Sequence, residues 1–117
     1  MLTCKNLLYY ILERFYEYEW DEAKNTKNIG KHQSLPLSDG IEVFWDKARV
    51  ISEDERFNYG EKRYIAIGYA DGKVLSVCFT YRRFLKRRLI SVRVASRKER
   101  RRYYGKQSLR YDRQAGS

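Results

Sequence analysis

Residues 62–82 contain the pattern that most restricts the possible folds of this chain, two β-rich runs separated by a tight turn. The runs, Lys62–Ala70 and Lys73–Arg82, flank the dipeptide Asp71-Gly72. An Asp-Gly pair favours a two-residue type I′ turn, because both residues tolerate a positive φ angle. The sequence therefore predicts an antiparallel β-hairpin.

Three further runs are expected to add strands to this hairpin. Residues 16–20 alternate aromatic rings with carboxylates, and this two-residue period is typical of a strand with one buried face. Residues 48–52 and 87–95 are also β-rich. Side chains alternate along a strand, so the last run has two faces. Its core face is expected to carry Ile90, Val92 and Val94. Its other face is expected to carry Leu89, Ser91 and Arg93.

Four helices are predicted from apolar spacing and capping residues. Residues 1–14 place leucine and isoleucine at helical spacing, which predicts a short amphipathic helix. Asp21 is a suitable N-cap for a helix over 21–32. Ser38 or Asp39 is expected to cap a second helix that ends near Asp46. That helix is expected to bury Leu37, Ile41 and Phe44.

The final helix is predicted from a capping box. In Ser96-Arg97-Lys98-Glu99, the Ser96 hydroxyl and the Glu99 carboxylate can each satisfy a free backbone N–H at the start of a helix over 97–104. Together these elements predict an α+β fold. A chain of 117 residues has room for one domain, and its 43% hydrophobic content suffices for one modest core. We expect an N-terminal extension over 1–15, a folded domain over 16–105 and a polar tail over 106–117.

The basic excess of the chain is confined to one region. Residues 1–81 carry 11 basic and 13 acidic side chains, whereas residues 82–102 carry eleven basic side chains against the single carboxylate of Glu99. Most of the eleven are arginines, whose guanidinium groups bind phosphate oxygens in pairs. We expect them to gather on one exposed flank and bind nucleic acid. The alternatives are a merely solvated surface and a surface that docks on an acidic protein.

The sequence lacks the motifs of several enzyme classes. One histidine and two distant cysteines, Cys4 and Cys78, do not form a familiar zinc site, and phosphate-binding and dinucleotide-binding glycine loops are absent. We therefore expect no cofactor and no disulfide, and a cytoplasmic location. The longest apolar run, residues 7–12, is shorter than the roughly 20 residues that span a membrane. Acid/base cleavage of a phosphodiester remains, with cations to stabilise the charged transition state.

Several segments, in this order and spacing, resemble the BrnT toxins, the ribonuclease components of BrnT/BrnA type II toxin–antitoxin systems. The segments are Trp20-Asp21-Glu22-Ala23-Lys24, Asn28, Lys31-His32, Glu42-Val43-Phe44, Glu61-Lys62-Arg63-Tyr64-Ile65-Ala66-Ile67-Gly68, Ile90-Ser91-Val92-Arg93-Val94-Ala95-Ser96, Glu99 and Tyr103.

The resemblance implies a RelE-like fold with an antiparallel sheet of about four to five strands, two helices in the N-terminal half and a C-terminal helix. It also implies RNA cleavage that needs no metal and inhibits translation. The implied partners are RNA and a neutralising BrnA-like antitoxin with a ribbon-helix-helix DNA-binding domain.

Four residues are candidates for catalysis. Arg93 is the best candidate to bind a phosphate or the transition state, with an ion pair to Glu99 or Glu61 as its alternative role. His32 is the side chain whose ordinary pKa, near 6.5, suits proton transfer at neutral pH, although a helix-end role explains it equally well. Lys31 is a candidate phosphate ligand. Glu99 is a candidate base, but its place in the capping box explains it fully.

Five residues are candidates for RNA binding. The cations are Lys24, Arg97, Arg100 and Arg101, and each can instead be a solvated surface charge. Tyr103 can stack on a base, but packing on the sheet explains it better. Two other functions remain open: a non-catalytic RNA- or ribosome-binding module, and a protein-docking unit with a basic face.

Overall fold

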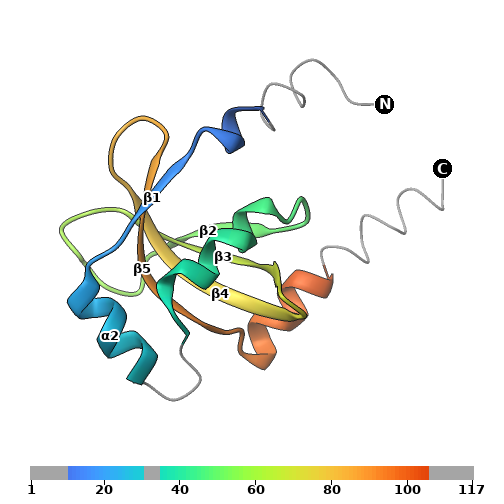
Figure 1. The fold of residues 1–117 in the computed structure, drawn as a ribbon. Helices are drawn as coiled ribbons and strands as arrows, with labels where there is room; N and C mark the ends of the chain where they lie inside the picture. The colour runs from blue at the N-terminus through green and yellow to red at the C-terminus, as the bar shows by residue number, and fades with distance from the viewer. Residues whose placement is uncertain (1–10, 31–34, 106–117) are drawn as a thin grey trace.

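A computed structural model of the protein describes residues 11–30 and 35–105. Within these residues five strands form one mixed sheet in the order β1-β5-β4-β3-β2 (Figure 1). The strands are β1 (Glu17–Glu19), β2 (Val50–Asp54), β3 (Arg63–Ala70), β4 (Lys73–Tyr81) and β5 (Lys86–Val94). β1 runs parallel to β5 and every other pair is antiparallel. The predicted α+β class is confirmed, with one parallel strand added to an antiparallel sheet.

The predicted hairpin is formed by β3 and β4. Ala70 pairs with Lys73 across the turn, and both turn residues have positive φ angles, 48° at Asp71 and 79° at Gly72. An Asp-Gly pair tolerates this conformation, so the local sequence sets the turn and the turn sets the register of the hairpin.

The helices before residue 31 lie where the sequence predicts them, as far as the structure describes them. α2 (Glu22–Gly30) begins as predicted, because the Asp21 carboxylate accepts hydrogen bonds from the N–H groups of Ala23 and Lys24 at 2.8 and 3.3 Å. Its predicted end at residue 32 lies outside the described residues. Residues 11–14 are helical, whereas residues 1–10 of the predicted first helix also lie outside them.

η1 (Leu37–Trp45) is a 3-10 helix, and its predicted side-chain cap is wrong. The N-cap is Pro36 and makes no side-chain hydrogen bond, so neither Ser38 nor Asp39 begins the helix. Proline fixes φ near the helical value and begins the segment without such a bond. η1 lies directly on the sheet, since a Cβ atom on Gly40 would come within 2.7 Å of Val92 and 3.0 Å of Val77. The predicted burial of Leu37 and Phe44 and the end at Asp46 are confirmed, whereas Ile41 is only partly buried.

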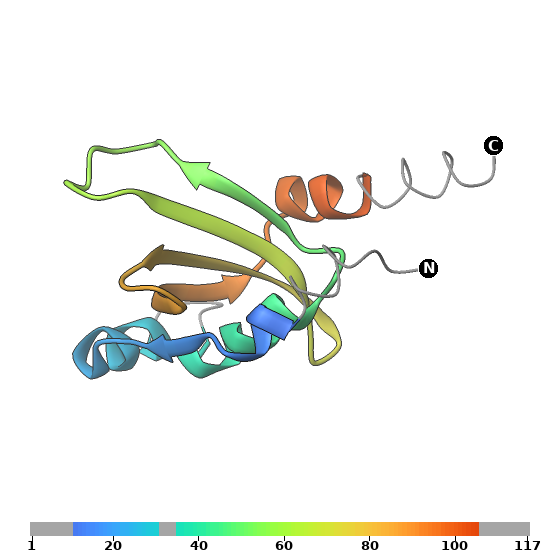
Figure 2. The ribbon, with the colours of Figure 1, turned by 90° about the horizontal axis from the view of Figure 1, so that it is seen from above.

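The two faces of the sheet differ in how they are covered (Figure 2). η1 packs on the covered face, which carries Leu75, Val77 and Phe79 of β4. The C-terminal helix, described over residues 97–105, lies on the opposite, open face and packs with Tyr103 on Val50, Ile67, Val74 and Ala95 at one end. The rest of the open face carries Cys78 of β4 and Ser91 and Arg93 of β5. None of the described helices is long and apolar enough to cross a membrane.

A bulge in β5 changes the faces predicted for that strand. Phe79 pairs with Leu89 but Cys78 pairs with Ser91, so Ile90 is an extra residue. The insertion reverses the alternation of side chains on its N-terminal side. Leu89, expected on the other face, is therefore a core residue with 2% exposure, and Ile90, expected in the core, is only half-buried. Val92 and Val94 contribute to the core as predicted.

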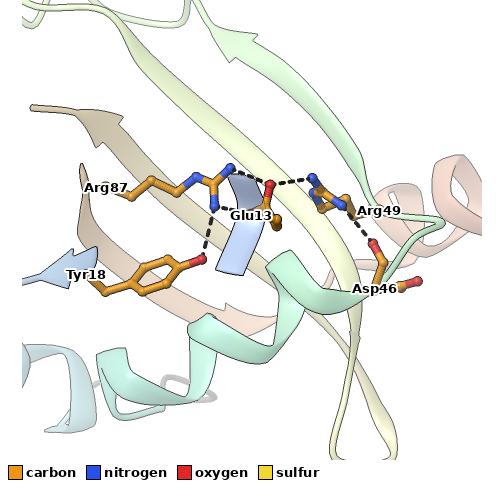
Figure 3. A network of polar contacts seen from close by, with 5 residues as sticks. All are labelled: Glu13, Tyr18, Asp46, Arg49 and Arg87. Atoms are coloured by element: carbon orange, nitrogen blue, oxygen red, sulfur yellow. Dashed lines mark hydrogen bonds and ion pairs between the residues drawn. The ribbon is translucent and has the colours of Figure 1, made fainter. Parts of the chain in front are cut away.

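A buried ion network joins the N-terminal segment to the covered face (Figure 3). Glu13 accepts hydrogen bonds from Arg87 and, at 3.2 Å, from Arg49. Arg87 also donates to the Tyr18 hydroxyl at 3.0 Å, and its guanidinium lies 3.7 Å from the centre of the Tyr16 ring. Burial alone would lower the pKa of Arg87, but the hydrogen bonds to Glu13 raise it above its ordinary value. Arg87 is therefore a charged residue of the core.

Candidate nucleic-acid interface

A cleft of about 390 Å³ opens beside α2, which contributes Lys24, Lys27 and Asn28 to its lining. Its other walls come from the loop between β2 and β3, from the start of β3 and from the middle of β4 and β5. Four of its lining residues are basic, namely Lys24, Lys27, Arg56 and Arg63, and none is acidic. These cations come from two regions that are distant in the sequence, α2 and residues 56–63, and the fold brings them together around one cavity.

Asn28 sets the position of α2 at this cleft. β1 pairs with residues 86–88 of β5, and in the part of the chain that the structure describes the edge of β5 beyond them has no strand partner. The carbonyl oxygen of Val92 on that edge accepts hydrogen bonds from the Asn28 side chain at 2.9 Å and from the N–H of Leu35 at 3.1 Å. Asn28 is buried, and its amide also donates to the carbonyl of Leu35. These bonds hold the lysines of α2 beside β5.

Arg56 is held by a buried carboxylate, and most of the Arg56 side chain remains in solvent. Its Nε and Nη2 atoms donate to Asp54 at 2.8 and 3.0 Å, and the Tyr59 hydroxyl donates to the same carboxylate at 3.0 Å. The Asp54 side chain is 1% exposed and that of Arg56 is 61% exposed. Hydrogen bonding from Arg56 lowers the pKa of Asp54 to about 2. The pair therefore stays charged at neutral pH and presents a fixed guanidinium at the cleft.

Arg63 is the second arginine of the cleft, and it is partly neutralised. Its guanidinium lies 4.1 Å above the Tyr59 ring, and its Nε donates to Glu61 at 3.4 Å. Glu61 also forms an ion pair with Arg82 at 3.2 Å. The two arginines share one carboxylate, so this corner of the cleft keeps a positive charge.

Cys78 lies on the floor of the cleft but is not an activated thiol. Burial raises its pKa, the charge of Asp54 raises it further, and the opposing charges of Arg63, Arg56 and Arg93 are too weak to reverse the shift. The thiol is neutral at neutral pH and hence a weak nucleophile. Within residues 11–30 and 35–105, no group of three or more histidine, cysteine or carboxylate side chains is arranged to hold a metal ion.

Arg93 lies on the open face, as predicted, and is paired with Glu99. Its Nη1 donates to Glu99 at 2.6 Å, and the arginine side chain remains 41% exposed. Glu99 also accepts from the Ser76 hydroxyl at 2.7 Å and from the N–H of Ser96 at 2.9 Å, and the N–H of Glu99 donates to the Ser96 hydroxyl at 3.2 Å. The predicted capping box and the predicted alternative role of Arg93 are thus both present.

The same contacts determine the protonation of Glu99. Burial alone would raise its pKa, but hydrogen bonds from Arg93, Ser96 and Ser76 outweigh burial and lower it. Both carboxylate oxygens are engaged, so the geometry suits Glu99 to orienting Arg93 better than to accepting a proton.

The other predicted site residues have different outcomes. Lys24 lines the cleft, and Arg97, Arg100 and Arg101 are exposed on the C-terminal helix. The prediction that Tyr103 stacks on an RNA base is wrong, because the ring packs on the sheet with 4% exposure and its hydroxyl donates to Asp46 at 2.5 Å. Lys31 and His32 lie outside the described residues.

The expectation that all basic residues after Tyr81 share one exposed flank is also wrong. Arg87 points into the covered face and is 2% exposed. β5 has nine residues and a length of roughly 30 Å, so it separates the arginines of the 82–85 loop from those of the C-terminal helix. Four of these basic side chains pair with carboxylates of the chain: Arg82, Lys86, Arg87 and Arg93. The cleft residues Lys27, Arg56 and Arg63 were not among the predicted site residues, because their meeting depends on the fold.

Comparison with known proteins assigns the chain to a family. A sequence model described as the ribonuclease toxin BrnT of type II toxin–antitoxin systems matches residues 20–99. The chain belongs to the BrnT family. The 1.1 Å crystal structure of the Brucella abortus ribonuclease toxin BrnT is similar, with 28% sequence identity and a TM-score of 0.52, covering 70% of this chain and 99% of that chain. No protein with a curated description matches the sequence.

Family membership gives the cleft a functional context. BrnT proteins are ribonuclease toxins of type II toxin–antitoxin systems, which implies an antitoxin partner for this chain. Every residue that lines the cleft falls within the range matched by the family. Glu13, which closes the buried network on the covered face, precedes that range.

Proposed function

We propose that this BrnT-family protein cleaves RNA without a metal ion at the cleft on its open face, and so inhibits translation. The observation that carries the proposal is the meeting of Lys24, Lys27, Arg56 and Arg63 around one cavity in a ribonuclease-toxin fold. Four cations with no acidic residue in the lining form a binding site for successive phosphates of an RNA strand.

Arg93 is proposed as the group that stabilises the transition state. Phosphodiester cleavage concentrates negative charge on the phosphoryl oxygens, and a fixed guanidinium at that place lowers the barrier. Arg93 is fixed by Glu99 and Val94 and is still partly exposed. We therefore assign Glu99 the role of a positioning residue.

His32 and Lys31 complete the proposed site. They follow α2 directly in the sequence, and α2 forms one wall of the cleft. The imidazole of His32 would move the proton at neutral pH, and Lys31 would contact a phosphate. Arg97, Arg100 and Arg101 on the C-terminal helix would bind RNA beyond the scissile bond. The proposed antitoxin is a BrnA-like protein with a ribbon-helix-helix DNA-binding domain.

Purified full-length protein tests the proposal directly. We expect it to shorten single-stranded RNA in the presence of EDTA, and its induced expression to arrest growth. R93Q and H32Q should each lose both effects while the melting temperature stays unchanged. K73Q, which removes an exposed charge at the opposite end of the hairpin, is the matched control and should keep full activity. Intact RNA after incubation with a well-folded wild type would refute the proposed ribonuclease activity.

A non-catalytic RNA-binding role is the second candidate. The observation that favours it is the chemistry at the described cleft: the pKa of its Cys78 thiol is raised, and the pKa of Asp54, the carboxylate that holds Arg56, is about 2. Neither group exchanges a proton readily at neutral pH. This role predicts salt-sensitive RNA binding with no change in RNA length, and the same incubation separates it from cleavage.

A further inference from the structure

Two phenylalanine side chains are strongly exposed at one end of the sheet. Phe84 is 87% exposed and Phe57 is 68% exposed. Phe84 lies in the loop over 82–85 between β4 and β5, and Phe57 lies in the loop over 55–62 between β2 and β3. Both loops project from the end of the sheet nearest α2 (Figure 2). Neither ring contributes to the cores on the two faces of the sheet.

The two loops are joined to each other and to the cleft. Arg82 of one loop forms an ion pair with Glu61 of the other at 3.2 Å. The Phe57 ring packs edge-on against Tyr59 with 5.8 Å between ring centres, and Tyr59 lines the cleft beneath the guanidinium of Arg63. The Phe57 ring therefore continues the surface that begins with the cations of the cleft, and the Arg82–Glu61 ion pair ties the loop that carries Phe84 to the loop that carries Phe57.

Each exposed ring is adjacent to an arginine in the sequence, Arg56 before Phe57 and Arg83 before Phe84. Aromatic faces interleaved with cations are the surface that binds single-stranded nucleic acid, because bases stack on the rings while the cations follow the backbone. A protein partner would favour a continuous apolar patch instead.

We propose that Phe57 and Phe84 stack on unpaired bases at the end of the cleft, and that they make the protein selective for single-stranded RNA. This inference rests on the proposed RNA-binding function of the cleft. In a duplex the bases already stack on one another, so a strand whose bases are free gains a contact that a duplex does not. Phe57 contributes more than Phe84, since its ring touches the wall of the cleft.

The test measures the affinity of full-length variants for a short 2′-O-methyl RNA, which resists cleavage, as a single strand and as a duplex. We expect F57A to bind the single strand about tenfold more weakly and F84A about fivefold more weakly, and both to bind the duplex as the wild type does. The dependence of affinity on salt should not change, because no charge is removed. F57Y, which keeps an aromatic ring at this position, should bind the single strand as the wild type does.

Trp45 provides the matched control. It is 66% exposed at the end of η1, on the covered face, and W45A removes an equally exposed ring away from the cleft. We expect W45A to bind RNA as the wild type does. Unchanged melting temperatures for all variants would show that the effects are local.

The outcomes separate this inference from the proposed function. Tight binding of RNA by the wild type and equally tight binding by F57A and F84A would overturn the stacking role and leave the proposed function intact. Equal losses on single strand and duplex would overturn the selectivity. Normal RNA binding by F57A and F84A together with escape from antitoxin neutralisation would assign the rings to a protein contact instead. A wild type that binds no RNA would overturn both proposals.

Discussion

The covered and open faces of the sheet use arginine in opposite ways. On the covered face Arg87 and Arg49 have side chains that are 3% and 6% exposed, and both bind Glu13. On the open face the side chains of Arg56 and Arg93 are 61% and 41% exposed, although each also has a carboxylate partner. The position of an arginine relative to the sheet, and not its place in a basic run, therefore decides whether its guanidinium is open to a ligand such as RNA.

The difference follows from solvation. A charge that is removed from water must be paired and hydrogen-bonded, so the Arg87 guanidinium is enclosed by Glu13, Tyr18 and aromatic rings and has no surface for a ligand. On the open face only the carboxylate is buried. The carboxylates of Asp54 and Glu99 bind Arg56 and Arg93 from the side of the protein interior, and the guanidinium groups keep access to solvent.

The largest expected effect comes from breaking the covered-face network. E13A leaves Arg49 and Arg87 buried without their carboxylate, and we expect the free energy of unfolding to fall by about 3–5 kcal/mol. Urea denaturation measures this change. E17A is the control from the same segment, because Glu17 is 77% exposed and lies 3.9 Å from Lys86. It should cost less than about 0.5 kcal/mol. Similar losses for the two variants would contradict the buried network.

The next effect concerns Arg93 on the open face. R93Q should lower the rate of RNA cleavage by about 100-fold, because an oriented cation near a transition state contributes on the order of 3 kcal/mol. Its free energy of unfolding should change far less than that of E13A. E99Q should lower the rate less than R93Q, since it loosens Arg93 without removing it. An R93Q protein that unfolds as easily as E13A would assign Arg93 to structure.

The smallest expected effect is a pH dependence of stability on the open face. The pKa of Asp54 is about 2 in the folded protein and about 3.8 ordinarily, so the stabilisation is present above pH 4 and is lost as the pH falls toward 2. We expect a loss on the order of 1 kcal/mol, because solvent screens the exposed Arg56. Thermal melting of wild type and D54N across this range measures it. Parallel curves for the two proteins would exclude the effect.

The sequence predicted those parts of the fold that depend on neighbouring residues. The Asp71-Gly72 turn, the Asp21 cap and the Ser96–Glu99 capping box each depend on contacts within four residues, and all three are present. The bulge at Ile90 was missed, because an inserted residue leaves no mark in an alternating pattern. It determines that Arg87 and Leu89 face the core.

The parts of the site that the sequence missed depend on distant pairs. Glu13 and Arg87 are 74 residues apart, so their contact could not be expected from spacing. Arg56 and Lys24 meet at one cleft only after the sheet has formed. The resemblance indicated the family, and the strand pattern placed Arg93 on the open face. The charge density along the chain, however, overestimated how many basic side chains after Tyr81 lie on one exposed flank.

The most direct test of the open-face cleft is the salt dependence of RNA binding. The slope of log affinity against log salt reports the number of phosphates contacted, at about 0.7 per contact for a single strand. We predict that K24Q/K27Q lowers this slope by about 1.4 relative to the wild type, while K73Q leaves it unchanged. Equal slopes for wild type and K24Q/K27Q would contradict RNA binding at this cleft.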